Sequence, residues 1–433
     1  MLKTPPAGQL STYIIVGLVA SLATIAVTLL VLNWTGAERK IAHQLPRLYE
    51  TDDAEFRRSL STLLGPALVE GNQVRELVNG DAIFSEMLAA IRSAKRTITF
   101  ETYIYWSGKI GREFVDALSE RARNGVKVHV LLDWVGSIKM DNALLNELSA
   151  AGIEVERFHE PHWSHWGKMN NRTHRKLLVV DGQVGFTGGV GIADHWRGNA
   201  RNKDEWRDNH FRVEGPVVAQ IQSVFLDNWM RSTGRVLHGE AYFPALKPAG
   251  RQVAQMFSSS PNGGSESMQL MYLLAITSAR KTIDLANSYF VPDELTIKTL
   301  IDAARRGVRI RVLVPSGHID SETVRRASRG TWGPMLEAGV QIAEFQPSMY
   351  HVKGLVVDGM FSSVGSTNFD NRSFRLNDEA NLNVLDTGFG ATMQRVFEDD
   401  WSKSKRIDLA AWQHRPLSER AWERLALLLR TQL

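Results

Sequence analysis

The chain has 433 residues, of which 43% are hydrophobic and 23% charged, so most of it can fold around substantial cores. Its formal net charge of +4 suits a membrane surface or a phosphate-bearing substrate, but falls short of the basic bias of a dedicated nucleic-acid binder. The chain contains no cysteine, which excludes disulfides, thiol catalysis and zinc held by cysteine.

The N-terminal segment is the most apolar part of the chain. No charged residue lies between Lys3 and Glu38, and residues 13–34 form an apolar run long enough to span a bilayer. A cleaved signal peptide is the alternative, but its apolar region is usually shorter and ends at a small-residue cleavage site. We therefore predict a transmembrane helix over 13–34 and a polar connector over 35–75. The excess of basic residues after the helix favours a cytoplasmic body.

After the connector, strands and helices alternate, and their order occurs twice. Residues 90–105 end a helix and enter a strand, and residues 111–133 form an amphipathic helix followed by a buried strand. Residues 275–291 and 294–315 repeat this order. The offset between equivalent elements changes little along the chain, which indicates a duplication with small loop changes.

The duplication predicts a two-lobed α/β protein. We place the first lobe over residues 76–237 and the second over 253–433. The stretch between them, 238–252, contains two prolines and two glycines and forms the junction.

The third repeated element carries the chemistry. Residues 174–182 read HRKLLVVDG and residues 351–359 read HVKGLVVDG. Alternate side chains of a strand share a face, so the histidine and lysine of each copy point the same way. The Asp-Gly pair predicts a two-residue hairpin turn. Counting back from that turn places His351 opposite Ser366, with Asn368 one step further on the same face.

An imidazole, an ammonium, a hydroxyl and an amide on one face can together hold a phosphate group. In the first half, the same count places Gly189 opposite His174, and Gly191 takes the position of Asn368.

Each motif is followed by an acid, Asp208 after the first and Glu379 after the second. A catalytic histidine commonly needs a carboxylate that orients its ring and stabilises its charge. We predict that Asp208 pairs with His174 and Glu379 with His351, and that each carboxylate raises the pKa of its histidine. The alternative is that both acids form only surface ion pairs, and that each His-Lys pair lies on a solvated face.

The segments 174–189 and 351–374 resemble the two HxKxxxxD motifs of the phospholipase D superfamily, and more narrowly its bacterial cardiolipin synthase and phosphatidyltransferase branch. The phrases WRDNHFRVEGPVVAQIQSVFLDNW (206–229), GSTNFDNRSFRLNDE (365–379) and RPLSERAWERLALLL (415–429) are similar to that branch in particular. The resemblance implies a pseudo-twofold sandwich of two α/β lobes with one active site between them. It implies the following motif residues for that site: His174, Lys176, Asp181, His351, Lys353 and Asp358.

The resemblance also implies roles. His174 is expected to attack phosphorus and His351 to act as acid and base, while Lys176 and Lys353 hold the phosphate oxygens without a metal or a cofactor. The two motif aspartates are explained by their turns alone, so we favour a structural role for both.

One position departs from the family pattern. Relatives often carry asparagine where this chain has Gly191, so the first half lacks an amide matching Asn368. The backbone N–H groups of Gly188 and Gly189 are the candidates to replace it.

The expected function is a phosphatidyltransferase of the bacterial inner membrane that makes cardiolipin from phosphatidylglycerol and a second phospholipid. The alternative is a hydrolase acting on phospholipids or, with less support, a nuclease. A non-catalytic membrane scaffold is disfavoured because both His-Lys pairs are intact. We expect a membrane and phospholipid substrates as partners, and neither nucleic acid nor an obligate protein partner.

Two further segments bear on membrane contact. Residues 158–174 contain Trp163 and Trp166, which suit either a rim loop at the lipid entrance or a partly buried aromatic cluster. Its histidines at 159, 162 and 165 are too loosely spaced to predict a metal site. The C-terminal residues 417–433 can lie on a bilayer, although packing against the second lobe is the favoured interpretation.

Overall fold

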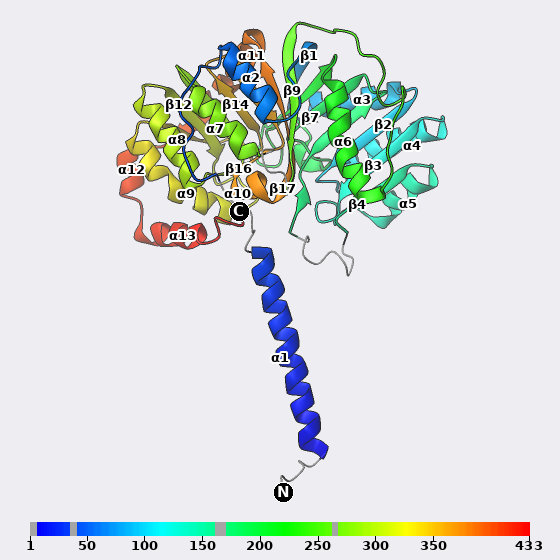
Figure 1. Cartoon of the computed structure of the whole chain (residues 1–433), viewed down its shortest axis with the longest axis horizontal. Helices are drawn as coiled ribbons and strands as arrows, with labels where there is room; N and C mark the ends of the chain where they lie inside the picture. The colour runs from blue at the N-terminus through cyan, green and yellow to red at the C-terminus, as the bar shows by residue number, and fades with distance from the viewer. Residues whose placement is uncertain (1–6, 35–40, 161–169, 262–266) are drawn as a thin grey trace.

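The computed structural model describes residues 7–34, 41–160, 170–261 and 267–433. Helix α1 (Ala7–Trp34) stands apart from the body and contains the predicted apolar run (Figure 1). Its segment Ser11–Thr28 has a mean hydropathy of 1.9 and none of it is buried. Among the described residues it is the one helix long and apolar enough to cross a membrane, judged by length and composition.

One continuous sheet runs through both lobes. The first-lobe strands follow the order β4-β3-β2-β6-β7-β8-β1, and the second-lobe strands continue as β9-β17-β15-β14-β10-β12-β13-β18. The first-lobe strands are β1 (Val69–Val78), β2 (Thr97–Thr102), β3 (Lys127–Asp133), β4 (Glu154–Phe158), β5 (Arg172–Thr173), β6 (Lys176–Val180), β7 (Val184–Gly188) and β8 (Asn209–Glu214). The second-lobe strands are β9 (Gln252–Ser259), β10 (Thr282–Asn287), β11 (Phe290–Val291), β12 (Arg309–Pro315), β13 (Gln341–Phe345), β14 (Lys353–Val357), β15 (Phe361–Gly365), β16 (Phe369–Asp370), β17 (Asn377–Leu385) and β18 (Ser404–Arg406).

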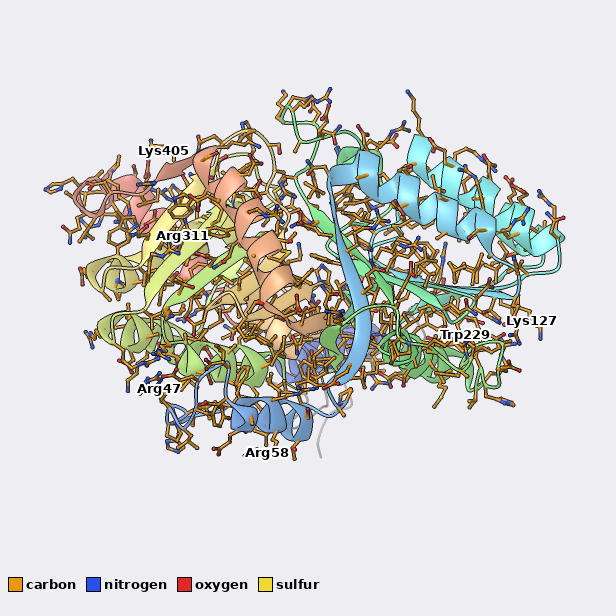
Figure 2. The ribbon with its side chains drawn as sticks, turned by 90° about the horizontal axis from the view of Figure 1, so that it is seen from above. Arg47, Arg58, Lys127, Trp229, Arg311 and Lys405 are labelled. Atoms are coloured by element: carbon orange, nitrogen blue, oxygen red, sulfur yellow. The ribbon has the colours of Figure 1, made fainter. Side chains whose placement is uncertain are left out.

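The lobes join where β1 pairs antiparallel with β9. Seen from above, β1 runs between the two lobes, with Lys127 on the outer side of the first and Lys405 on the outer side of the second (Figure 2). Strand β1 begins at Val69, inside the segment 35–75 that we expected to be a connector, because its backbone also pairs with β8. The predicted class of two α/β lobes is confirmed.

Helices cover both faces of the sheet. They are α2 (Ala54–Leu63), α3 (Asn79–Ser93), α4 (Lys109–Arg123), α5 (Asn142–Ala150), the short 3-10 helix η2 (Asp194–Trp196), α6 (Val218–Thr233), α7 (Met268–Ser278), α8 (Glu294–Arg305), α9 (Glu322–Glu337), α10 (Asn371–Arg375), α11 (Thr387–Ser402), α12 (Leu409–Gln413) and α13 (Leu417–Leu427). One face of the first lobe packs against α3, α4 and α5, and one face of the second lobe packs against α7, α8 and α9.

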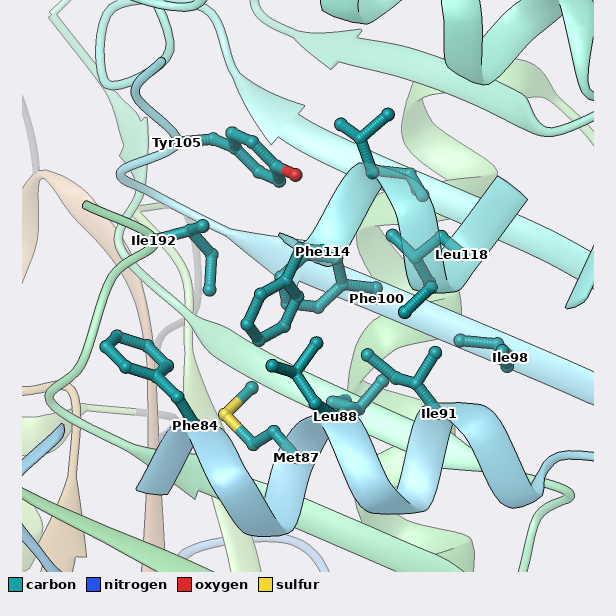
Figure 3. Packing of buried hydrophobic residues seen from close by; sticks show 14 of the residues in the cluster. Phe84, Met87, Leu88, Ile91, Ile98, Phe100, Tyr105, Phe114, Leu118 and Ile192 are labelled. Carbon is teal, nitrogen blue, oxygen red and sulfur yellow. The ribbon is translucent and has the colours of Figure 1, made fainter. Parts of the chain in front are cut away.

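The core of the first lobe shows why these helices form and stay. Apolar residues at helical spacing on α3, such as Phe84 and Met87, point at Phe100 of β2 and Phe114 of α4 (Figure 3). The rings of Phe100 and Phe114 stack with their centroids 5.8 Å apart. Burying one such side chain contributes roughly 1.5–3 kcal/mol.

A separate apolar cluster ties the lobes together on the other face of the sheet. It combines α6 and α11 with residues of both halves, including Val213 of β8 and Leu382 of β17. Phe211 of the first lobe meets Phe389 of the second with ring centroids 6.0 Å apart. Because the two lobes share this core, residues at their junction are held in fixed positions.

The motif hairpins differ from the predicted geometry by one residue. Val180 pairs with Val184 and Val357 pairs with Phe361, so each loop has three residues rather than the two that we predicted. Asp358 and Gly359 both have positive φ, at 54° and 65°, as an Asp-Gly turn requires, and one further residue then completes the loop.

The motif aspartates fold these turns against the neighbouring strand. The Asp181 carboxylate accepts hydrogen bonds from the backbone N–H groups of Lys95, Arg96 and Thr97 at 2.7–3.2 Å. Asp358 accepts the equivalent bonds from Arg280, Lys281 and Thr282 at 2.6–2.8 Å. Both carboxylates lie at the far end of the motif strand from its histidine, which agrees with a structural role.

Candidate active site

Each motif histidine is bound to the backbone of the other lobe. The N–H of His174 donates to the carbonyl of Asp378 at 2.9 Å, and the N–H of His351 donates to the carbonyl of Arg207 at 2.8 Å. Strand β5, which precedes His174, also pairs in parallel with the start of β17. The two histidines therefore lie at the junction of the lobes, in equivalent positions.

The carboxylates cross between lobes as well. His174 Nδ1 lies 3.0 Å from both carboxylate oxygens of Glu379, and His351 Nδ1 lies 2.7 Å from Oδ2 of Asp208. Both predicted acids contact a motif histidine, but the predicted pairing within each half is wrong. Asp208 follows Arg207, which pairs with Tyr350 of the second lobe, and Glu379 follows the residues of β17 that pair with β5 of the first lobe. Each acid therefore meets the histidine of the opposite half.

Both carboxylates are buried and held by further donors. Glu379 accepts the hydroxyl hydrogen of Ser366, and Asp208 accepts from Trp196 Nε1 at 3.0 Å and from its own neighbour's backbone, Asn209 N, at 2.8 Å. Burial pushes the pKa of each carboxyl up, but its histidine and the nearby lysines outweigh burial and lower it. Both groups are therefore carboxylates at neutral pH.

The histidines have pKa values below the ordinary range. Burial, with a smaller contribution from Lys176, lowers the pKa of His174 to about 4, although Glu379 pushes it upward. Burial and Lys353 lower the pKa of His351. The prediction of a net rise is wrong, because the cost of burying an imidazolium exceeds the attraction of one carboxylate. Hydrogen bonding assigns the proton to Nδ1, which leaves the lone pair of Nε2 facing away from the carboxylate.

The motif lysines lie on the same face as their histidines, as predicted. Lys176 Nζ donates to the carbonyl of His174 at 2.6 Å, and Lys353 Nζ donates to that of His351 at 2.6 Å and to Ser288 Oγ at 2.8 Å. Burial lowers their pKa values to about 7 and about 8. Within the described residues, neither ammonium has a directly bonded carboxylate, so a phosphate between the lobes would relieve the cost of burying both.

The two halves of the site are not identical. Thr102 pairs with Lys176, and Asn287 pairs with Lys353, so the next residues, Tyr103 and Ser288, are equivalent. Ser288 Oγ lies 2.7 Å from Asn368 Oδ1 and so links that amide to Lys353.

In the first lobe an aromatic ring takes this place. The ring centroid of Tyr103 is 5.0 Å from that of His174, and Lys176 Nζ lies 5.4 Å from the centroid of Tyr103. Gly191 stands at the position of Asn368, and a Cβ atom there would come within 2.6 Å of Ile104 Cβ. The first lobe therefore has no room for an amide. The backbone N–H groups of Gly188 and Gly189 were expected to replace that amide. The Gly189 N–H, however, already donates to the carbonyl of Asn209 at 3.1 Å.

Ser366 and Asn368 both reach the site, although by other routes than predicted. The one-residue change of register moves Ser366 away from His351 and places its hydroxyl on Glu379, the partner of His174. Asn368 acts on Lys353 through Ser288.

Aromatic residues that the sequence did not single out flank His351. The rings of Trp196 and Trp206 lie 5.2 and 5.5 Å from its ring, between centroids. Arg207, which accepts the His351 N–H at its carbonyl, is itself held by two bonds to Asp400 of α11, at 2.9 and 2.8 Å. Trp206 and Arg207 belong to the segment that contained Asp208, but no local pattern pointed to α11.

On the opposite side, Thr173 fixes the backbone before His174. Its N–H donates to Asp133 Oδ2 at 3.0 Å and its hydroxyl donates to Glu101. Both acids are buried, and burial raises their pKa values to about 6 and about 7. They are therefore positioning groups that no sequence pattern indicated.

The proposed rim residues Trp163 and Trp166, with the histidines at 162 and 165, lie outside the described residues. His159 is described and its Nδ1 lies 3.3 Å from the carbonyl of Asn171. Within the described ranges, no group of three or more His, Asp and Glu side chains is arranged to hold a metal ion.

Comparison with known proteins agrees with this geometry. The family model described as cardiolipin synthase, PLD-like domain, matches residues 87–229 and 272–401, one stretch in each lobe. The cardiolipin synthase of Geobacillus kaustophilus is 37% identical over 363 residues, covering 83% of this chain and 72% of the relative. Cardiolipin synthase A of Pseudomonas fluorescens is 34% identical over 337 residues, covering 78% and 70%.

Among solved structures, the phosphatidylserine synthase of Haemophilus influenzae aligns with a TM-score of 0.66 at 15% identity. The alignment covers 88% of this chain and 100% of that one, which shows a shared fold.

Proposed function

Because this chain belongs to the cardiolipin synthase family of phospholipase D-like proteins, as its paired motifs predicted, we propose that it makes cardiolipin by phosphatidyl transfer. The donor is phosphatidylglycerol and the acceptor is the headgroup hydroxyl of a second phospholipid. The observation that carries the proposal is the crossed pair of buried histidines. Each is held at Nδ1 by a carboxylate of the other lobe and accompanied by a lysine that bonds no carboxylate in the part of the chain that the structure describes.

In the first step, His174 Nε2 attacks the phosphorus of phosphatidylglycerol. The bond from phosphorus to the glycerol oxygen breaks, and that oxygen takes a proton from His351 Nε2 as glycerol leaves. The lowered pKa of His174 keeps its ring neutral at working pH, as a nucleophile requires; the pKa of His351 is lowered as well, so the choice between the two histidines rests on the family resemblance. The negative phosphate favours the protonated form of His351 when substrate is bound.

In the second step, His351 takes the proton of the incoming hydroxyl. That oxygen attacks phosphorus, the bond from phosphorus to His174 Nε2 breaks, and cardiolipin forms. Lys176 and Lys353 stabilise the non-bridging oxygens in both steps. Glu379 and Asp208 keep each ring oriented throughout.

We place the reaction at the bacterial inner membrane. Helix α1 supplies a single N-terminal anchor, and the basic residues Arg39, Lys40 and Arg47 that follow it favour a body on the cytoplasmic side.

The test is to reconstitute the full chain in liposomes with labelled phosphatidylglycerol and to separate cardiolipin from phosphatidic acid. We expect cardiolipin and free glycerol in equal amounts, and no loss of rate in the presence of a chelator. Phosphatidic acid in place of cardiolipin would identify a hydrolase instead.

Single variants test the shared site. His174→Ala and His351→Ala should each abolish turnover. His238→Ala, which changes an exposed histidine of the segment 238–252 that links the lobes, should leave turnover intact. Retention of about half the activity in either variant would mean two independent sites. With substrate labelled in its phosphate, an alkali-stable label should be trapped on wild type and be absent from His174→Ala.

A further inference from the structure

Helix α13 packs against the second lobe, as favoured from the sequence, through a mixed face. Ala426 is buried with Val324 and Ala327 of α9, and Leu427 packs against the same cluster. Glu423 is buried and meets Arg329 at 3.2 Å and Arg415 at 2.6 Å, while Glu419 lies 3.5 Å from the same Arg329. These ion pairs hold the helix against α9. A surface helix of a globular protein normally turns its apolar stripe toward the core, whereas three leucines of this segment remain exposed.

The outward side of α13 and of the residues after it is apolar. Leu417, Leu425 and Leu428 follow at helical spacing on one face, and their exposed fractions are 78%, 53% and 74%. Trp422 is 54% exposed on the flank of that face. Leu429, also exposed, follows this segment, and the remaining exposed large apolar residues of the described body lie elsewhere in the chain: Leu48, Leu63, Ile138, Met230 and Val236. A contiguous exposed apolar face indicates an interaction surface.

The position of α13 indicates what covers that face. Figure 1 shows α13 on the side of the body from which α1 extends, lying crosswise to α1. Arg420 and Arg424 border the apolar face, where they can meet anionic headgroups, and tryptophan favours the same boundary. We propose that α13 docks in the headgroup region of the bilayer that α1 crosses, with an anionic lipid surface as its partner.

The segment after α13 connects this surface to the active site. Asn371 Nδ2 donates to the carbonyl of Arg430 at 3.0 Å, and Arg372 N–H donates to that of Leu433 at 2.8 Å. Both donors belong to α10, which begins directly after the segment containing Asn368. A docked α13 would thus hold the second half of the site at a fixed height over the lipid surface, a consequence that rests on the proposed function.

The absence of cysteine from the chain permits a clean test. We would label Leu425→Cys and, as a matched control, Leu63→Cys with the same environment-sensitive fluorophore. Leu63 is exposed on α2, at the opposite end of the body from α1. In full-length protein in phosphatidylglycerol liposomes at low protein-to-lipid ratio, the label at 425 should be quenched by lipid-borne nitroxide and shielded from iodide. The label at 63 should behave in the opposite way.

Equal access of iodide to both labels would overturn the proposal. Shielding at position 425 that appears only at high protein-to-lipid ratio would also overturn it, because a second copy of the chain would then be the partner. The readout does not depend on turnover, so it can fail or succeed separately from the proposed reaction. As a second variant, Leu425→Gln with Leu428→Gln should fold normally, since both side chains are exposed, and should reduce cardiolipin formation on liposomes several-fold. Leu63→Gln should leave it unchanged.

Discussion

Glu379 of the second lobe holds His174 of the first, with Nδ1 of the imidazole 3.0 Å from both carboxylate oxygens. Asp208 and His351 repeat the relationship in the other direction at 2.7 Å. Each half contains one motif histidine and one acid, but the two that are in contact always come from different halves. The site therefore exists only when the lobes are joined.

Removing one acid's charge while keeping its shape should disable the opposite lobe's histidine. We expect Glu379→Gln and Asp208→Asn each to lower kcat by orders of magnitude. The equivalent carboxylate-to-amide change in the catalytic triad of a serine protease, an unrelated enzyme, lowers kcat roughly 10⁴-fold. The measurement is the initial rate of cardiolipin formation by protein whose thermal unfolding matches wild type.

The control for this pair is Glu113→Gln, which removes a carboxylate from an exposed ion pair with Arg197. Such pairs contribute about 0–1 kcal/mol, so its rate should be nearly that of wild type. Wild-type turnover in Glu379→Gln would show that the carboxylate serves only packing.

The reaction should have a bell-shaped pH profile in kcat/KM, which reports the free enzyme. The rate should fall as pH rises through about 7 to 8, because Lys176 and Lys353 lose the protons that bind phosphate. It should fall again toward about pH 4, where His174 gains a proton and loses its lone pair. A rate that stays constant from pH 6 to about 10 would contradict protonated lysines as the phosphate-binding groups.

Lys176→Met should stabilise the substrate-free protein. The folded-state pKa of Lys176 is about 7, below its ordinary value, so between about pH 7 and 10 the unfolded chain binds more protons than the folded one. The stability of wild type therefore rises with pH across that window. Below it, the full cost of burying the charged Lys176 is present. The variant should have a higher Tm than wild type at pH 6, and the difference should shrink by pH 9. Lys298→Met, at an exposed lysine, serves as control. An equal rise in Tm in that variant would show that the burial of the Lys176 charge is not the cause.

Asp181→Ala should weaken the fold and spare the chemistry. The substitution removes the acceptor of three backbone N–H groups and leaves alanine at a φ of 55°. We expect a loss of roughly 1.5–3 kcal/mol in unfolding free energy, as for bonds to a charged group. The rate per folded molecule should change less than a few-fold. Asp181→Asn should recover part of the stability, and a folded but inactive Asp181→Ala would make the aspartate catalytic.

Gly191→Ala should destabilise the first lobe. The added Cβ would come within 2.6 Å of Ile104 Cβ, and overpacking of this kind costs typically about 1–3 kcal/mol. Gly317→Ala is the matched control, because its Cβ would meet no atom of the described residues within 4 Å. Denaturant unfolding of both variants measures the difference. A Gly191→Ala protein as stable as wild type would show that Ile104 moves easily, and that the family's asparagine could be restored.

Local pattern was sufficient for several features. The apolar run at 13–34, the alternation of helices and strands and the twin His-x-Lys motifs depend on residues close together in the chain, and the structure contains all of them. The Asp-Gly turns were found at the right place. The loops have three residues rather than two, and the carboxylates of Asp181 and Asp358 also bond the backbone before β2 and β10, which is distant in sequence.

The sequence by itself determined which residue types make up the candidate site: two His-x-Lys pairs at repeated spacing, each followed further along the chain by an acid. Only the tertiary structure decided which acid serves which histidine, because the residues just before Asp208 and Glu379 pair with the backbone of the opposite lobe. It also decided the charge state of the rings. A pKa reflects burial summed over all neighbours, and the burial of His174 outweighs the single carboxylate that the sequence suggested.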